Sequence, residues 1–202
     1  MREIFWLGLG DEEAIKDLEK TKIGVIGSRL VLELLWRCGF GCIKYVGDFI
    51  TPNDVLLDVT IKPLEANNYD VVHPMSDESY VVSYLYFDFK ELKKQLKGCD
   101  IIIAHKHIED SAKVAEELGA LFMPNFITTF LPDGVSYFEV EIPKIKYDPV
   151  SYSLNCSLQV SELVKLIVGR GVPVIAPKAY IVQISNRGYL KKLRLKLKKR
   201  ET

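Results

Sequence analysis

Residues 22–47 read KIGVIGSRLVLELLWRCGFGCIKYVG, and this stretch decides the fold. The apolar run Lys22–Ile26 predicts a short buried strand, and the Gly27–Ser28 pair predicts a turn after it. Leu30–Trp36 then predicts an apolar helix, and Cys42–Val46 predicts a second strand after a glycine-rich stop. This strand–turn–helix–strand order is typical of an α/β fold of the dinucleotide-binding type.

The turn after the first strand lacks most of the glycines that such a site uses. A G-x-G-x-x-G loop lets a phosphate approach backbone N–H groups without interference from Cβ atoms. Here Gly27 is followed by Ser28, Arg29, Leu30 and Val31. Ser28 is expected to cap the helix, and Arg29 is expected either to reach a phosphate or to pair with an acid. The sequence therefore predicts the scaffold of a nucleotide site with a reduced phosphate-binding loop.

Strands and helices alternate along the chain as far as about residue 130. Helices are expected at Asp11–Lys20, Lys90–Lys97 and Glu109–Leu118. Strands are expected at Tyr80–Phe87, at Asp100–Ala104 and within Leu121–Phe130, with Val55–Ile61 as a further strand candidate. The alternation predicts a Rossmann-like, mostly parallel sheet with helices on both faces.

The pattern changes after residue 130. VSYFEVEI, at Val135–Ile142, alternates apolar and polar side chains and predicts a strand. Ser153–Val168 predicts a helix that ends at a glycine. Ala179–Ile184 and Leu190–Leu197 flank a turn that contains Asn and Gly, which predicts an antiparallel hairpin. These late strands are expected to add antiparallel elements toward the C-terminus.

Length and composition fit one domain. We expect a single domain over residues 1–202, with a nucleotide-type α/β core at 8–130 and the antiparallel strands, helix and hairpin at 131–202. The 27 basic and 27 acidic residues balance, but residues 191–200 hold seven basic residues and no acid. This charge separation favours an intramolecular or self-associating match. Because no aromatic residue interrupts the basic run, we expect no nucleic-acid partner.

The four cysteines, Cys38, Cys42, Cys99 and Cys156, lie in apolar segments and form no C-x-x-C pair. We therefore expect buried, reduced thiols in a cytoplasmic protein, with Cys156 as a core thiol rather than the carrier of a thioester. The N-terminus lacks the features of a signal peptide. No apolar run reaches the roughly 18 residues of a membrane helix, so we expect no membrane contact.

Four stretches of this sequence resemble the ThiF/MoeB/HesA family, which has the ubiquitin-activating-enzyme-like fold. They are Gly10–Gly27, Cys38–Asp48, Gly98–Ala104 and Ser157–Gly169, and the resemblance extends from about residue 8 to residue 197. The resemblance implies a protein that binds ATP and magnesium. It also implies adenylation of the C-terminal glycine of a ubiquitin-like or sulfur-carrier protein, usually by a dimer.

The resemblance places the nucleotide site at Gly27, Ser28, Arg29, Asp48 and Lys106. Asp48 stands where the family binds the ribose, with one carboxylate in place of paired acids, and it is either such a ribose ligand or an ordinary loop acid. Lys106 stands near the family's metal-binding aspartate. A charged lysine has three donors and no lone pair, so it cannot ligate magnesium. We therefore doubt the magnesium site, whereas ATP binding stays open.

The residues around Lys106 allow two interpretations. His105, Lys106 and His107 follow a strand whose carboxyl end lies where ligands bind in such sheets. They form either a cationic pocket that binds an anion without metal or an exposed strand-to-helix loop.

Two functions remain open for the whole chain. The first is a binding or partner protein that has lost adenylation and pairs with itself, with an active homologue or with a carrier protein. The alternative is an active adenylyltransferase with an atypical nucleotide site. A nicotinamide or nucleotide sensor that uses the same cleft is a third hypothesis.

Overall fold

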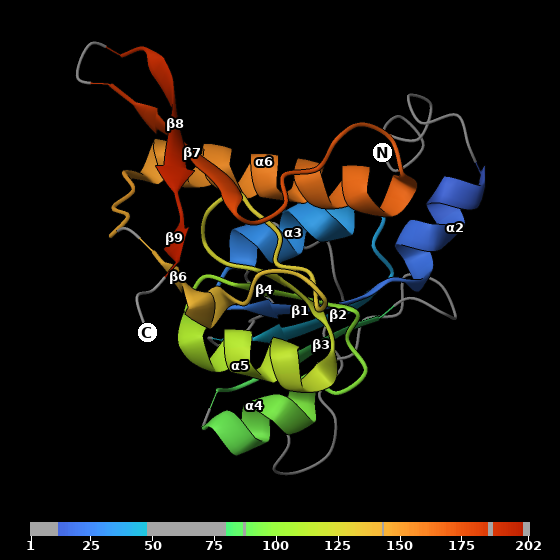
Figure 1. Ribbon diagram of the computed structural model, residues 1–202. Helices are drawn as coiled ribbons and strands as arrows, with labels where there is room; N and C mark the ends of the chain where they lie inside the picture. Colours follow the sequence, from blue (N-terminus) through green and yellow to red (C-terminus); the bar gives the residue numbers. More distant parts are fainter. Residues whose placement is uncertain (1–11, 48–79, 87, 143, 186–187, 200–202) are drawn as a thin grey trace.

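The computed structural model describes residues 12–47, 80–86, 88–142, 144–185 and 188–199 (Figure 1). Five parallel strands form the central sheet in the order β3-β2-β1-β4-β5. Their bounds are Lys22–Ile26 for β1, Cys42–Val46 for β2, Tyr80–Tyr84 for β3, Ile101–Ala104 for β4 and Leu121–Met123 for β5. The predicted parallel sheet is confirmed, and β1 lies at its centre.

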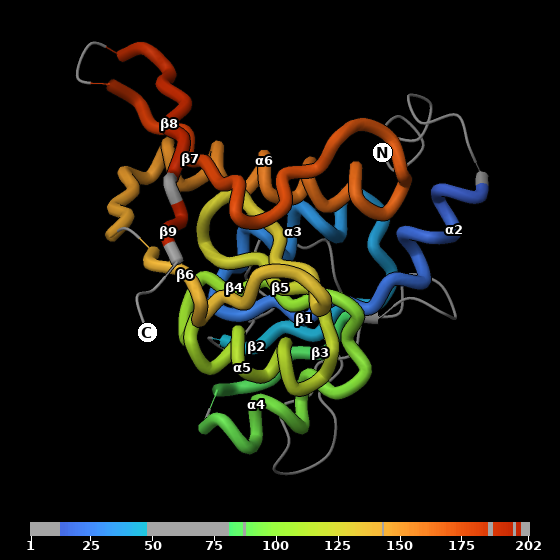
Figure 2. Tube along the Cα trace, in the orientation of Figure 1, coloured from blue at the N-terminus to red at the C-terminus, as the bar shows by residue number. Residues whose placement is uncertain are grey.

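Helices cover both faces of this sheet, as predicted (Figures 1 and 2). One face carries α2 (Glu12–Lys20), α3 (Arg29–Arg37) and α6 (Pro149–Val168). The other face carries α4 (Phe89–Leu96) and α5 (Ile108–Leu118).

The strands divide their side chains between two cores. Ile23 and Val25 of β1 lie in the core under α3 and α6, whereas Ile26 lies in the core under α4 and α5. Strands that are buried on both faces read as continuous apolar runs, which explains why β1 and β4 are recognisable in the sequence. Gly24 brings α4 close, because a Cβ at this position would lie 2.6 Å from Cδ2 of Leu96.

The predicted C-terminal hairpin is confirmed. Strands β7 (Lys178–Ile184) and β8 (Leu190–Lys196) pair antiparallel. A separate short pair joins β6 (Val140–Glu141) to β9 (Lys198–Lys199).

The prediction of a strand over Val135–Ile142 is wrong. The segment forms a short 3-10 helix, η1 (Tyr137–Glu139), and only β6 is extended. Ser136 and Glu139 form a capping box: the Ser136 hydroxyl accepts from the N–H of Phe138 at 3.1 Å, and the Glu139 carboxylate accepts from the N–H of Ser136 at 3.4 Å. This turn buries Tyr137 against aromatic side chains of the core, and burial outweighs the alternating pattern.

Helix α6 begins at Pro149, four residues before the predicted start. Asp148 caps it and accepts hydrogen bonds from the N–H groups of Val150 and Ser151, both at 3.0 Å. Pro149 suits the first helical position because no partner is needed there for its missing N–H. The strand candidate Val55–Ile61 lies outside the described residues. Within the described ranges, every helix is too short or too polar to span a bilayer.

A stripe of buried polar side chains on α6 binds the segments that cross the helix. These residues, spaced to share one face, are Ser151, Asn155, Gln159 and Glu162. Asn155 bonds both backbone groups of Val182 in β7. Its Oδ1 accepts from the Val182 N–H at 3.0 Å, and its Nδ2 donates to the Val182 C=O at 2.6 Å. Ser151 Oγ accepts from the N–H of Ile184 at 3.0 Å. Helix α6 thus supplies β7 with the hydrogen bonds that a neighbouring strand would otherwise give.

We expect Asn155→Ala to lower the free energy of unfolding by about 1–3 kcal/mol, because it leaves the partly buried N–H and C=O of Val182 without their partner. Ser157→Ala, on the exposed side of the same helix, is the matched control and should change stability by less than about 0.5 kcal/mol. Urea denaturation measures both variants. Equal midpoints for the two would contradict the role given to Asn155.

Candidate functional site

The carboxyl ends of β1, β2 and β4 meet at one edge of the sheet, where ligands bind in open parallel sheets. A cavity of about 340 Å³ lies at this edge. It is lined by Gly27, Val46, Gly47, Leu85, Tyr86, Lys106 and His107. This cavity is the candidate site.

Gly27 and Lys106 pack against each other at the carboxyl end of β1. Gly27 has a φ of +73°, and a Cβ there would lie 2.5 Å from Cγ of Lys106. The Gly27 N–H donates to the C=O of Val46 at 2.9 Å. Gly27 is therefore required by the approach of Lys106, and its N–H is used within the sheet.

Ser28 and Arg29 do not line the cavity. Ser28 is 2% exposed and caps α3, where its Oγ accepts from the N–H of Val31 at 3.3 Å. The same Oγ lies 2.8 Å from the hydroxyl oxygen of Tyr152. Arg29 is the exposed first residue of α3. Of the five residues proposed from the sequence, the structure brings Gly27 and Lys106 together in the cavity, and Asp48 lies outside the described residues.

Tyr86 and His107 supply an aromatic part of the cavity lining. Their rings stack with centroids 3.6 Å apart and planes 13° apart. The Tyr86 hydroxyl donates to Oδ2 of Asp110 at 2.7 Å, and this bond raises the pKa of Tyr86 to about 12. His107 has a φ of 49°, a left-handed conformation that costs a non-glycine residue about 1–3 kcal/mol. The cavity therefore offers one lysine cation beside an aromatic pair.

A chain of hydrogen bonds joins the end of β4 to α6. His105 Nδ1 lies 3.0 Å from the Tyr152 hydroxyl oxygen, and its Nε2 lies 2.8 Å from Oε1 of Gln159. Gln159 Nε2 donates to the C=O of Pro124 at 2.5 Å. With Ser28, which contacts Tyr152, the chain connects the start of α3 to the segment after β5.

The direction of this chain follows from Gln159. Since its Nε2 donates to Pro124, its Oε1 faces His105 and accepts from Nε2–H of the ring. In a neutral ring, Nδ1 then accepts from Tyr152, and Tyr152 accepts from the Ser28 hydroxyl. Burial lowers the pKa of His105, which favours this neutral form.

The four cysteines are free thiols, and the prediction that Cys156 is a core thiol is confirmed. Cys156 is fully buried, and burial raises its pKa to about 11. A thiol with this pKa is almost entirely protonated at neutral pH, so it is a poor nucleophile. Cys42 and Cys99 are also buried, and Cys38 is half-buried. Across the described ranges, no group of three or more His, Cys, Asp or Glu side chains is arranged to hold a metal ion.

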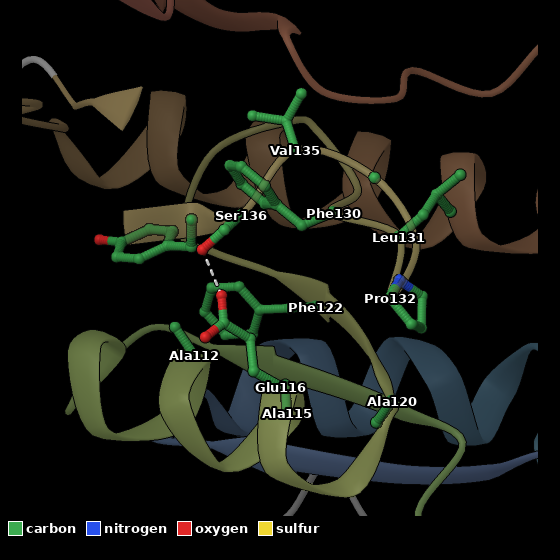
Figure 3. Close-up of a pocket in the computed structure, with 12 residues that line it drawn as sticks. Ala112, Ala115, Glu116, Ala120, Phe122, Phe130, Leu131, Pro132, Val135 and Ser136 are labelled. Carbon is green, nitrogen blue, oxygen red and sulfur yellow. Dashed lines mark hydrogen bonds between the residues drawn. The ribbon is translucent and has the colours of Figure 1, made fainter. Parts of the chain in front are cut away.

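A second cavity, of about 280 Å³, lies between α5 and the turn at 131–137 (Figure 3). Tyr137 meets Phe122 and Phe130 edge to face there, at centroid distances of 5.3 and 5.6 Å. The Ser136 hydroxyl donates to the Glu116 carboxylate at its mouth. Its lining includes no Lys, Arg or His, so it offers no cation to an anionic ligand. The edge of the parallel sheet therefore remains the better candidate for a nucleotide.

Comparison with known proteins rests on structure, since no family model and no curated protein sequence matches the chain. The structure matches E. coli MccB with a TM-score of 0.60 and 13% identity, over 90% of this chain and 64% of that one. The chain shares its fold with MccB. The match to E. coli MccB with ATP has a TM-score of 0.57 and 14% identity, over 90% of this chain and 66% of the other.

A third match is the microcin C7 biosynthetic enzyme MccB in complex with N-formylated MccA, with a TM-score of 0.57 and 13% identity. It covers 94% of this chain and 69% of that one. The chain thus spans about two thirds of the length of the MccB chains. At this identity the match shows the MccB type of fold alone.

The sequence analysis missed the side chains that join α6 to the site, Tyr152 and Gln159. A usable signal was present, because polar residues recur at helical spacing in an otherwise apolar helix. Such a stripe indicates a buried polar contact. The segments it contacts are distant in sequence, and the pattern does not identify them.

We expect acidification to destabilise the protein through His105. Its folded pKa is lowered, so the stability due to the neutral ring is complete above about pH 6.5 and is lost as the pH falls toward the folded pKa. The slope is at most about 1.4 kcal/mol per pH unit. His105→Gln should remove this part of the slope, and His107→Asn, which tolerates the left-handed conformation, should retain it.

Urea denaturation of wild type and both variants between about pH 5 and 7 measures this effect. A slope in His105→Gln as steep as that of wild type would show that another group is responsible.

Proposed function

We propose that this chain is a binding or partner protein with an MccB/ThiF-type fold that does not adenylate. The observation that carries the proposal is the use of the donors at the start of α3 within the protein itself. The Gly27 N–H bonds Val46, the Val31 N–H bonds Ser28, and the Ser28 hydroxyl lies against Tyr152. A phosphate at this turn would have to displace these bonds.

Adenylation would require those donors. It develops negative charge on the α-phosphate and on the leaving pyrophosphate, which a metal, cations and loop N–H groups must offset. Each such donor is worth about 3–4 kcal/mol in other enzymes. In this site Lys106 supplies one charge, and its aliphatic stem packs against Gly27.

The proposed partner is a small ubiquitin-like or sulfur-carrier protein, or a peptide. Two considerations support this choice: the resemblance to the ThiF/MoeB/HesA family, and the fold match to E. coli MccB structures that contain MccA. We further propose self-association or pairing with a homologue. The separation of a basic C-terminal run from an acidic remainder supports that pairing.

The cavity favours a second candidate, an adenylyltransferase with an atypical nucleotide site. Lys106 and the stacked Tyr86–His107 pair offer a cation and an aromatic surface in one hollow. The fold match includes an E. coli MccB structure with ATP. In this alternative, Lys106 replaces part of the charge of a metal ion.

ATP–pyrophosphate exchange separates the two candidates. We expect exchange at background with magnesium and a panel of ubiquitin-like and sulfur-carrier proteins, because the turn after β1 keeps its donors for internal bonds. An active member of the ThiF/MoeB/HesA family with its own carrier protein is the positive control for the assay. Exchange above background with any carrier would support the second candidate and end the first.

Calorimetry with ATP examines the cavity itself. If Lys106 holds an anion without metal, ATP should bind with equal affinity with and without magnesium. Lys106→Ala should then weaken binding by about tenfold, as expected for the loss of one charged hydrogen bond. Lys90→Ala, at an exposed position on α4, should leave binding unchanged. The absence of heat under both conditions would remove the anion site and leave partner binding.

A further inference from the structure

The β7–β8 hairpin extends beyond the rest of the described chain, with β8 at one edge of a two-stranded sheet (Figures 1 and 2). Its sequence, LKKLRLK at Leu190–Lys196, is strongly basic. The proposal below depends on the direction of its backbone groups. It is independent of the cavity at the end of β1.

Hydrogen bonds of β7 show which residues face away from β8. Tyr180 exchanges both backbone bonds with Ile127, at 3.1 Å each. Val182 gives both of its backbone groups to Asn155, and the next even residue, Ile184, donates to Ser151. Backbone groups alternate in direction along a strand. The N–H and C=O groups of the even residues of β7 therefore point away from β8, and those of the odd residues bond to β8.

The register then fixes the direction of every group in β8. The odd residues of β7 stand opposite Lys191, Leu193 and Leu195. Ser185 continues the series and donates to the C=O of Tyr189 at 2.8 Å. The backbone N–H and C=O groups of the even residues Leu190, Lys192 and Arg194 therefore point outward. Among the described residues, no strand or isolated bridge pairs with this outer edge.

The side chains of β8 make this edge both anchored and basic. Leu193 and Leu195 pack against the core under α4 and α5. Lys192 and Arg194 are exposed, and Nζ of Lys192 lies 3.7 Å from the ring centroid of Tyr180. Leu190 is 64% exposed beside them. An incoming strand would meet a fixed ladder of backbone groups flanked by cations.

These features select one class of occupant. A second copy of β8 would place lysine and arginine opposite like charges, which is unfavourable between strands. A nucleic acid or an anionic bilayer would satisfy the cations and leave the backbone groups without a ladder. An extended acidic peptide satisfies both, because opposite charges pair across strands and its main chain completes the sheet.

We propose that the outer edge of β8 binds an extended acidic peptide segment as an added strand. Acidic side chains at alternate positions lie beside Lys192 and Arg194. The intervening side chains lie on the face of Leu193 and Leu195, so they are apolar. The occupant is therefore a segment that alternates acidic and apolar residues.

Binding is measured with the full chain and a labelled heptapeptide of alternating glutamate and valine, by fluorescence anisotropy. A peptide with lysine in place of glutamate is the matched probe. We expect the acidic peptide to bind at least about tenfold more tightly, since several opposite-charge pairs are replaced by like charges. Equal affinity for the two peptides would overturn the proposal.

Amide hydrogen exchange distinguishes the outward-facing amides of the even residues of β8 from the amides of the odd residues. In the free protein, the amides of Leu193 and Leu195 should be protected by β7, whereas those of Lys192 and Arg194 should exchange quickly. The acidic peptide should protect Lys192 and Arg194. Binding without protection of these two amides would identify a general anion surface, open to RNA or lipid, and would overturn the added strand.

Two substitutions at one position separate charge from backbone. Lys192→Ala removes the cation and keeps the N–H, and should weaken binding about threefold. Lys192→Pro also removes the outward N–H, which the hairpin itself does not use, and should weaken binding about tenfold further. Equal affinities of the two variants, with circular dichroism showing both folded, would contradict strand addition.

If Lys192→Pro does not fold, Arg194→Glu is the alternative test, because it keeps every backbone group and reverses one charge. This variant should bind the acidic peptide more weakly and the lysine peptide more tightly. Unchanged affinity for both peptides would overturn the proposal. Hydrogen exchange and sedimentation at several protein concentrations, without peptide, test whether a second copy is the occupant. Protection of Lys192 and Arg194 that rises with protein concentration would make a second copy the occupant and would overturn the acidic segment.

Discussion

Hydrogen bonds from the buried polar stripe of α6 hold the C-terminal hairpin against the nucleotide-type sheet. Asn155 and Ser151 pair with β7, and Glu162 accepts from the N–H of Val174 at 2.9 Å. Gln159 reaches the other side and binds both His105 and the C=O of Pro124. Because buried backbone groups are costly to leave unpaired, one helix determines where β7 and the ends of β4 and β5 lie.

The same helix also contacts the turn after β1. Tyr152 lies against Ser28, so the hydroxyl at the start of α3 belongs to an internal chain of bonds. The Gly27 N–H bonds the C=O of Val46, and the aliphatic stem of Lys106 packs against Gly27. The cavity at the carboxyl edge of the parallel sheet therefore lies beside a turn whose N–H and hydroxyl groups are used within the protein. Under the proposed function, this internal use of the donors is what separates a shared fold from shared chemistry.

The sequence predicted the elements that depend on local pattern. β1 and β4 are buried on both faces and read as short apolar runs, and the β7–β8 hairpin shows alternation around a glycine-containing turn. At Val135–Ile142 a capping box competed with the alternating pattern, and the burial of Tyr137 decided the outcome. The start of α6 was missed because Asp148 and Pro149 were not recognised as a helix cap.

The candidate site was less predictable because it depends on distant contacts. The positions of Gly27 and Lys106 at the carboxyl ends of their strands follow from the parallel sheet. The contacts of Ser28 and His105 with α6 involve residues 124 and 47 positions away, and no local pattern identifies them.

The steric exclusion between Gly27 and Lys106 has an evolutionary consequence. A Cβ at residue 27 and the side chain of residue 106 claim the same volume. Cβ of Lys106 would itself lie 2.6 Å from that atom, so any residue at 106 other than glycine requires glycine at 27 while the backbone keeps this position. The two positions are therefore epistatic, because a substitution at residue 27 also requires the backbone at residue 106 to move.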